Sequence, residues 1–162
     1  MPPGPLTCSC PGSTLLGGSS DGDRAVGDVI KGFPVRSYQG EKPRRLRLYF
    51  DTGSPYTFIK RSACRGLRAV YDLPKPMAFG GLGNGRFLAP QGAFLEVRLL
   101  GVWCRHAAYV VPDDVLEQRY DLLVGHDFMQ KFAVNIASRK RDVLLDRGAL
   151  RMAQTVRRMV DL

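Results

Sequence analysis

Short apolar runs, separated by Gly, Pro and charged residues, begin near Val26 and continue along most of the chain. Leu46, Leu48 and Phe50 occupy alternate positions, so they share one face of a predicted strand. That strand ends at Asp51. Short runs with turn-forming residues between them are typical of a compact domain built mainly from β-strands.

The same pattern predicts the remaining elements. We expect further strands at 29–35, 57–59, 95–99, 102–111 and 122–124, and a hairpin at 134–145. Pro34 places the first of these strands at a sheet edge, because proline lacks the N–H that a central strand needs. Short helical segments are expected at 62–70, 113–119 and 127–132. A terminal amphipathic helix is expected at about 149–161, with an apolar face formed by Ala149, Met152, Ala153, Val156, Met159 and Val160.

Residues 1–25 differ from the rest of the chain in composition. They are rich in Gly, Pro and Ser and carry too little apolar surface to offset the entropy of ordering. We therefore expect a disordered leader before a single domain at 26–162, in keeping with a length of 162 residues. No stretch is apolar enough to span a bilayer or to act as a secretory signal. We expect no membrane partner and an intracellular, cytoplasmic setting.

Composition and charge narrow the class of protein without selecting a function. The chain contains 18 Gly and 11 Pro, an abundance of turn formers that argues against a mostly helical bundle. The 24 Lys and Arg against 15 Asp and Glu give a formal net charge of +9. Such a charge permits a nucleic-acid or acidic-protein partner but selects neither. Net charge is evidence about association rather than about fold.

The four cysteines, Cys8, Cys10, Cys64 and Cys104, form no C-x-x-C pair and show no zinc-site spacing. We expect four free thiols and no metal. A soft-metal site that combines Cys8 and Cys10 with Cys104 and His106 stays as an alternative, but a short C-x-C near a chain terminus is weak evidence for it.

The segment with the clearest chemistry is Asp51-Thr52-Gly53-Ser54. It follows one predicted strand and precedes another, so its carboxylate emerges at a strand end. Gly53 lets the backbone approach that carboxylate and donate amide hydrogens to it, while Thr52 and Ser54 add hydroxyls that both donate and accept. We interpret the segment as a loop that holds one acid. A plain turn capped by Asp51 is the alternative for this segment taken alone.

One carboxylate is a poor catalyst of amide hydrolysis, because the reaction needs a base to activate water and an acid to protonate the leaving group. Two carboxylates that share one proton supply both. The chain has a single loop of this kind, since the segment around Asp146 lacks the Thr and the Ser. A two-fold dimer would place the Asp51 of each subunit on its axis.

A second motif is Gly-rich. Phe79 is followed by four Gly in six positions, and the segment contains an Asn84-Gly85 pair suited to a tight turn. We expect a β-hairpin here. The segment is a poor match to a phosphate-binding loop, because no helix clearly follows it.

These two motifs, followed in order by Leu123-Val124-Gly125 and a short predicted helix, resemble the retroviral-type, or retropepsin-like, aspartic proteases. The resemblance spans about Val29 to Leu145. It implies a closed, mostly antiparallel β domain with one short helix before the last hairpin, to which this chain adds its terminal helix. It also implies an aspartic endopeptidase that acts as a homodimer on an extended peptide and needs no cofactor.

The resemblance further implies roles for individual residues. Asp51 is expected to be the catalytic aspartate, Thr52 to brace the paired loops across the dimer axis, and Gly53 to complete the active-site turn. Water held between the two Asp51 carboxylates would attack the peptide bond without a covalent intermediate. Substrate contacts are expected from Ser54, Gly80, Gly81, Leu82, Gly83 and Val124, with the Gly-rich segment acting as a flap.

Three features depart from the family's pattern. Pro55-Tyr56 stands where an acidic residue usually follows the active-site turn, and His126-Asp127 stands where an Arg usually follows the apolar-apolar-Gly sequence. The chain is also predicted to end in a helix rather than a strand, so we expect a dimer interface that is built differently. A non-catalytic peptide-binding dimer of the same fold is one alternative, and a basic nucleic-acid-binding domain is another. Neither His106 nor His126 is assigned a role in chemistry.

Overall fold

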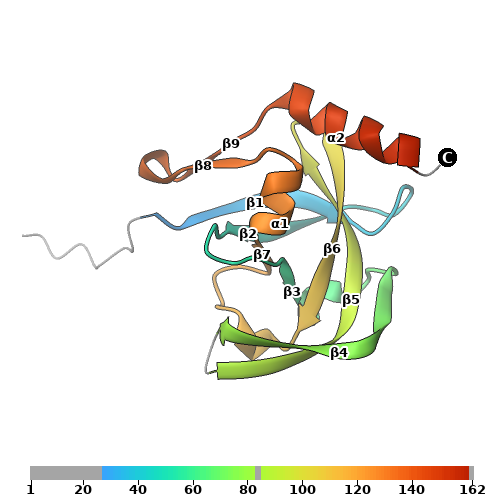
Figure 1. Cartoon of the computed structure of the whole chain (residues 1–162), viewed down its shortest axis with the longest axis vertical. Coiled ribbons are helices and arrows are strands. Elements are labelled where there is room, and N and C mark those ends of the chain that lie inside the picture. Colours follow the sequence, from blue (N-terminus) through green and yellow to red (C-terminus); the bar gives the residue numbers. More distant parts are fainter. Residues whose placement is uncertain (1–26, 83–84, 161–162) are drawn as a thin grey trace, which may run out of the picture.

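The computed structural model describes residues 27–82 and 85–160, and strands are its main element (Figure 1). The strands are β1 (Val29–Arg36), β2 (Arg44–Phe50), β3 (Phe58–Lys60), β4 (Val70–Leu82), β5 (Gly85–Leu99), β6 (Val102–Val111), β7 (Leu122–Val124), β8 (Asn135–Ala137) and β9 (Asp142–Leu144). The helices are α1 (His126–Lys131) and α2 (Arg147–Val160), with short 3-10 turns at Ser62–Cys64, Asp113–Val115 and Ser138–Lys140. The expected leader, residues 1–25, lies outside the described residues.

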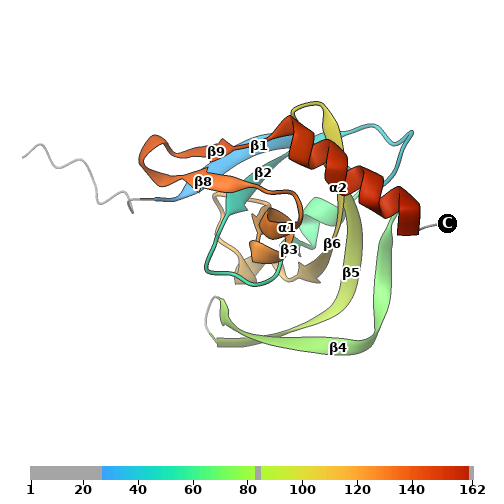
Figure 2. The same cartoon turned by 45° about the horizontal axis from the view of Figure 1, so that its top comes forward.

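The strands close into a barrel. Neighbours follow the order β1-β2-β7-β3-β6-β5, and β1 returns to β5 through the pairs Val35–Val97 and Arg36–Glu96. β4 pairs with β5 outside this ring and forms a long arm with it (Figure 1 and Figure 2). The predicted mostly β, closed domain is therefore confirmed.

Two of the strand pairings are parallel, those of β2 with β7 and of β3 with β6, whereas the other described pairings are antiparallel. The first of them forms where β7 inserts between β2 and β3, which precede it in the chain. An apolar pattern fixes which face of a strand is buried but leaves its partner open. The insertion of β7 is important for the site, because it brings residues 122–127 beside the loop that follows β2.

The core is built from the predicted alternating positions. Leu46, Leu48 and Phe50 of β2 are only 7%, 0% and 2% exposed. Val124 of β7 and Phe128 of α1 belong to the same buried cluster. Burial of this cluster therefore fixes both the end of β2 and the segment that joins β7 to α1.

Most other predicted elements are confirmed within a residue or two, including β3, β6, β7, α1 and the β8–β9 hairpin. β1 pairs with β2 along most of its length but with β5 only at Val35 and Arg36. Pro34 thus lies where, among the described pairings, one side of the strand has no partner, which agrees with its predicted edge position.

Two predicted helical segments are wrong beyond one turn. In 62–70 only Ser62–Cys64 is helical, and Gly66 then takes a left-handed φ of +84° that redirects the chain. In 113–119 only Asp113–Val115 is helical. Each segment buries a leucine, Leu67 in the first and Leu116 in the second. From the apolar pattern alone, such a leucine cannot be distinguished from one on the buried face of a helix.

α2 packs against β6, and Figure 2 shows it lying across the barrel. Asp146 caps its start, because its Oδ1 accepts the Ala149 N–H at 3.0 Å. The helix itself is confirmed, but its predicted apolar face is wrong at Met152, which is 69% exposed, while Leu150 is fully buried. Leu150 faces the barrel, and a residue two positions on points away from it. In the part of the chain that the structure describes, neither this nor any other helix is long and apolar enough to cross a membrane.

Cys64 and Cys104 are buried free thiols. Burial raises the pKa of Cys64 to about 11 and that of Cys104 to about 12. Both thiols therefore stay protonated at neutral pH, where a thiol is a poor nucleophile and metal ligand. Cys8 and Cys10 lie outside the described residues.

Candidate active site

Asp51 opens the loop that joins β2 to β3, residues 51–57, called the Asp51 loop below. The Asp51 N–H donates to the carbonyl of Val124 in β7 at 3.0 Å, which ties the start of the loop to the barrel. The Gly53 N–H donates to Asp51 Oδ1 at 2.9 Å, and the Ser54 N–H donates to the Asp51 carbonyl at 3.3 Å. A Cβ at Gly53 would lie 3.2 Å from Asp51 Oδ1. The carboxylate is thus held by the backbone of its own loop, with little room for a larger residue at Gly53.

The segment that joins β7 to α1 crosses the Asp51 loop at close range. The His126 N–H donates to the Ser54 carbonyl at 2.7 Å. At Gly125 the two backbones almost touch, because a Cβ there would lie 2.2 Å from the Tyr56 carbonyl oxygen and 2.8 Å from that of Ser54. Only glycine fits this crossing without a shift of the backbone.

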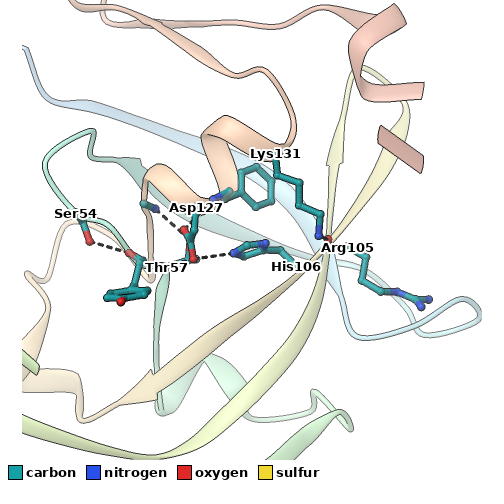
Figure 3. Close-up of polar contacts among 9 residues, drawn as sticks. Ser54, Thr57, Arg105, His106, Asp127 and Lys131 are labelled. Carbon is teal, nitrogen blue, oxygen red and sulfur yellow. Dashed lines mark hydrogen bonds and ion pairs between the residues drawn. The ribbon is translucent and has the colours of Figure 1, made fainter. Parts of the chain in front are cut away.

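Asp127 fastens the far end of the Asp51 loop (Figure 3). Its Oδ1 accepts the Thr57 hydroxyl at 2.7 Å, and its Oδ2 accepts the Thr57 N–H at 3.3 Å. The Thr57 hydroxyl accepts the Gly125 N–H at 3.1 Å, and His106 Nε2 of β6 lies 3.0 Å from Asp127 Oδ2. The sequence predicts no role for Asp127 or Thr57, and it offers His106 only as a ligand of the alternative soft-metal site; the available signal is the polarity of these residues within largely apolar segments.

The environment of Asp127 predicts how stability depends on pH. Burial by itself raises the pKa of this carboxyl, but hydrogen bonds from His106 and Thr57 outweigh it, and the pKa lies below its ordinary 3.8. A lowered folded-state pKa stabilises the fold above about pH 3.8, and this contribution is lost as the pH falls through the folded-state value. We expect Asp127→Asn to lower the free energy of unfolding by about 1–3 kcal/mol at pH 6. Urea unfolding at a series of pH values should show this difference shrinking below pH 3.8; a difference that is constant down to pH 2.5 would contradict the assignment.

A cleft of about 480 Å³ opens beside Asp51. It is lined by Asp51, Gly53, Ser54, Pro55, Tyr56, Phe58, Ala78, Phe79, Gly80, Gly81 and Leu82. These residues come from two parts of the chain, the Asp51 loop with the start of β3 and the end of β4. Figure 2 shows the arm of β4 and β5 curving around this side of the barrel. The fold therefore brings Asp51 and Ser54 to the same cleft as the predicted hairpin residues Gly80, Gly81 and Leu82.

Aromatic rings form much of the cleft wall. The Phe79 ring centroid lies 5.5 Å from that of Tyr56, 5.0 Å from that of Phe58 and 4.8 Å from that of Tyr109. Of the described residues that line the cleft, Asp51 is the one with an ionisable carboxyl group. The cleft thus combines an apolar wall with a single acid.

Some predicted site residues lie elsewhere. The Val124 side chain is fully buried in the core and does not line the cleft, so it does not fit the expected substrate contact; its carbonyl instead positions Asp51. Thr52 lines a separate cavity of about 370 Å³ together with His126. Gly83 lies outside the described residues. Asp146 caps α2 and is not among the described residues that line this cleft, so it is not a second acid for it.

Comparison with known proteins supports the fold. No protein-family model and no curated protein matches the chain. Among solved structures, EIAV protease in complex with the inhibitor HBY-793 matches with a TM-score of 0.51 and 12% sequence identity, over 72% of this chain and 98% of that one. The retroviral protease-like domain of Ddi1 from Leishmania major matches with a TM-score of 0.47 and 18% identity, over 72% of this chain and 86% of that one. The protein has a retropepsin-like fold, as the order of its sequence motifs implies.

Proposed function

We propose that the protein is an aspartic endopeptidase that works as a homodimer. The observation that carries this proposal is the position of Asp51: its carboxylate is held by the Gly53 N–H and borders a cleft whose opposite wall is the end of β4. A carboxylate held by a rigid loop beside an apolar cleft is what acid–base chemistry on a bound peptide requires.

The need for a dimer follows from the chemistry of hydrolysis. One carboxylate must take a proton from water while another group protonates the departing nitrogen. Two Asp51 side chains, one from each subunit and sharing a proton, meet both needs. The described lining of the cleft offers no second acid within one chain. In such a dimer Thr52, which is exposed on the Asp51 loop, braces the two loops across the axis.

The cleft also indicates how a substrate binds. An extended peptide adds to strand edges through its main-chain groups, while pockets accept its side chains. We propose that Gly80, Gly81 and Leu82 cover the peptide, with Ser54 on the opposite side. Because Phe58, Phe79 and Leu82 line the cleft, the side chain that it accepts is apolar.

The dimer proposal makes activity depend on protein concentration. Each subunit supplies half of the acid pair, so dilution below the dimer dissociation constant removes active sites by mass action. We expect the specific activity to fall with dilution and to follow the dimer fraction measured by sedimentation at the same concentrations. A specific activity that stays constant while the protein becomes monomeric would contradict the shared site.

The test of catalysis is incubation with a diverse peptide library between pH 4 and pH 7, with and without a statine-type transition-state mimic. A working acid pair should yield discrete cleavage products and should be inhibited by the mimic, because a mimic binds tightly only where the transition state is stabilised. Peptide binding without any cleavage at any pH would instead support a non-catalytic binding dimer.

A further inference from the structure

Behind the Asp51 loop lies a histidine that the proposed chemistry does not use. The His106 side chain points from β6 toward α1, is 13% exposed, and has its Nε2 3.0 Å from Asp127 Oδ2. Its ring meets the Phe128 ring edge-on, with the centroids 5.4 Å apart and the planes at 84°. Ring packing and the polar contact together hold His106 in one orientation.

Asp127 transmits this contact to the Asp51 loop. Its carboxylate accepts both the hydroxyl and the N–H of Thr57, and its own N–H donates to the Pro55 carbonyl at 3.2 Å. Figure 3 shows His106, Asp127 and Thr57 in a row that leads to the loop. The Asp127 Oδ2 contact with Thr57 is long, at 3.3 Å, whereas its contact with His106 is 3.0 Å. His106 is therefore the closer of the two partners that orient Oδ2.

The other end of α1 is tied to the same strand. Lys131 Nζ donates to the carbonyl of Arg105, the residue before His106, at 3.2 Å. α1 is thus fastened to β6 near both of its ends (Figure 3). Of these two attachments, the His106–Asp127 contact is the one that continues into the Asp51 loop.

We infer that His106 is a positioning residue for the Asp51 pair: by orienting Asp127, it sets the position of the Asp51 loop relative to the cleft. The kinetic consequence of this inference rests on the proposed function. Its structural consequence, the order of the loop, does not, and the two are measured separately.

The structural measurement is native-state amide hydrogen exchange in two variants that differ from the wild type only at His106. His106→Phe keeps an aromatic ring against Phe128 but loses the donor, whereas His106→Gln keeps an N–H near the position of Nε2. We expect exchange at the Thr57, His126 and Asp127 amides to become about 10-fold faster in His106→Phe, the effect of losing a hydrogen bond to a charged group. Exchange should return to within about 3-fold of wild type in His106→Gln.

A matched control separates local positioning from general loss of stability. Arg36→Gln removes an ion pair of Arg36 with the buried Glu96, at 2.8 Å, where β1 meets β5. This variant should lower global stability without speeding exchange selectively at the three amides. Unchanged exchange in His106→Phe, or the same selective change in Arg36→Gln, would overturn the inference.

The kinetic measurement uses a peptide that the wild-type protein cleaves. We expect kcat of His106→Phe to fall about 10- to 100-fold, because a small displacement of a reacting group costs that much, while KM stays within about 3-fold. His106→Gln should recover most of kcat, and Arg36→Gln should match wild type. If the wild-type protein cleaves nothing, the proposed function fails, while the exchange data still decide whether His106 orders the loop.

Discussion

Asp51→Asn should lower kcat/KM for peptide cleavage by about 10⁴-fold, the upper end of what general acid–base catalysis contributes. We expect a loss of this size because one substitution per chain removes both carboxylates of the homodimer at once. An asparagine side chain has nearly the same shape as aspartate, and its Oδ1 can still accept the Gly53 N–H, which lies 2.9 Å from the carboxylate in the wild type. The fold and the dimer should therefore remain.

A matched control for Asp51→Asn is Asp142→Asn, which makes the same chemical change at an exposed carboxylate of β9, outside the cleft lining. It should cleave peptides at the wild-type rate. Both variants should match the wild type in sedimentation and near-ultraviolet circular dichroism. Cleavage by Asp51→Asn at even a tenth of the wild-type rate would remove Asp51 from the chemistry and, with it, the proposed function.

The sequence predicts the parts of this protein that depend on local pattern. Alternation at Leu46, Leu48 and Phe50 is a direct consequence of strand geometry, and it placed Asp51 at a strand end. The Gly-rich segment likewise predicted a hairpin, and Leu82 pairs with Gly85 there, but the predicted strand at 95–99 is only the last part of β5, which begins at Gly85. By contrast, the face that α2 buries depends on how the helix lies on the barrel, so Met152 was assigned inward when Leu150 is the buried residue.

The hydrogen bonds that hold the far end of the Asp51 loop were not predictable in the same way. Thr57, His106 and Asp127 lie far apart in sequence and meet only because β7 inserts between β2 and β3 while β3 also pairs with β6. No local pattern encodes that insertion. The sequence did contain Gly125 at the end of an apolar-apolar-Gly run. The steric need for glycine at this position becomes visible only where the two backbones cross.

Of the glycines that the structure describes, Gly125 should be the one at which alanine destabilises the fold most, and Gly125→Ala should lower the free energy of unfolding by about 3–5 kcal/mol. A Cβ at this position would overlap the Tyr56 carbonyl oxygen at 2.2 Å and the Tyr56 carbonyl carbon at 2.5 Å. Both are backbone atoms, so no side-chain rotation relieves the overlap. The two segments must separate, which weakens the His126 N–H bond to the Ser54 carbonyl and displaces the Asp51 loop.

Alanine substitutions at two other glycines serve as controls for Gly125→Ala. A Cβ at Gly80 meets nothing within 4 Å, and one at Gly53 lies 3.2 Å from Asp51 Oδ1. Urea unfolding should therefore show destabilisation that increases in the order Gly80→Ala, Gly53→Ala, Gly125→Ala. The free energy of unfolding of Gly80→Ala should lie within about 1 kcal/mol of wild type. The slope of unfolding free energy against urea concentration should be unchanged in all three variants. A Gly125→Ala protein as stable as Gly80→Ala would mean that the loops do not cross as closely as described. In that case the support of Asp51 by the segment after β7 would need another explanation.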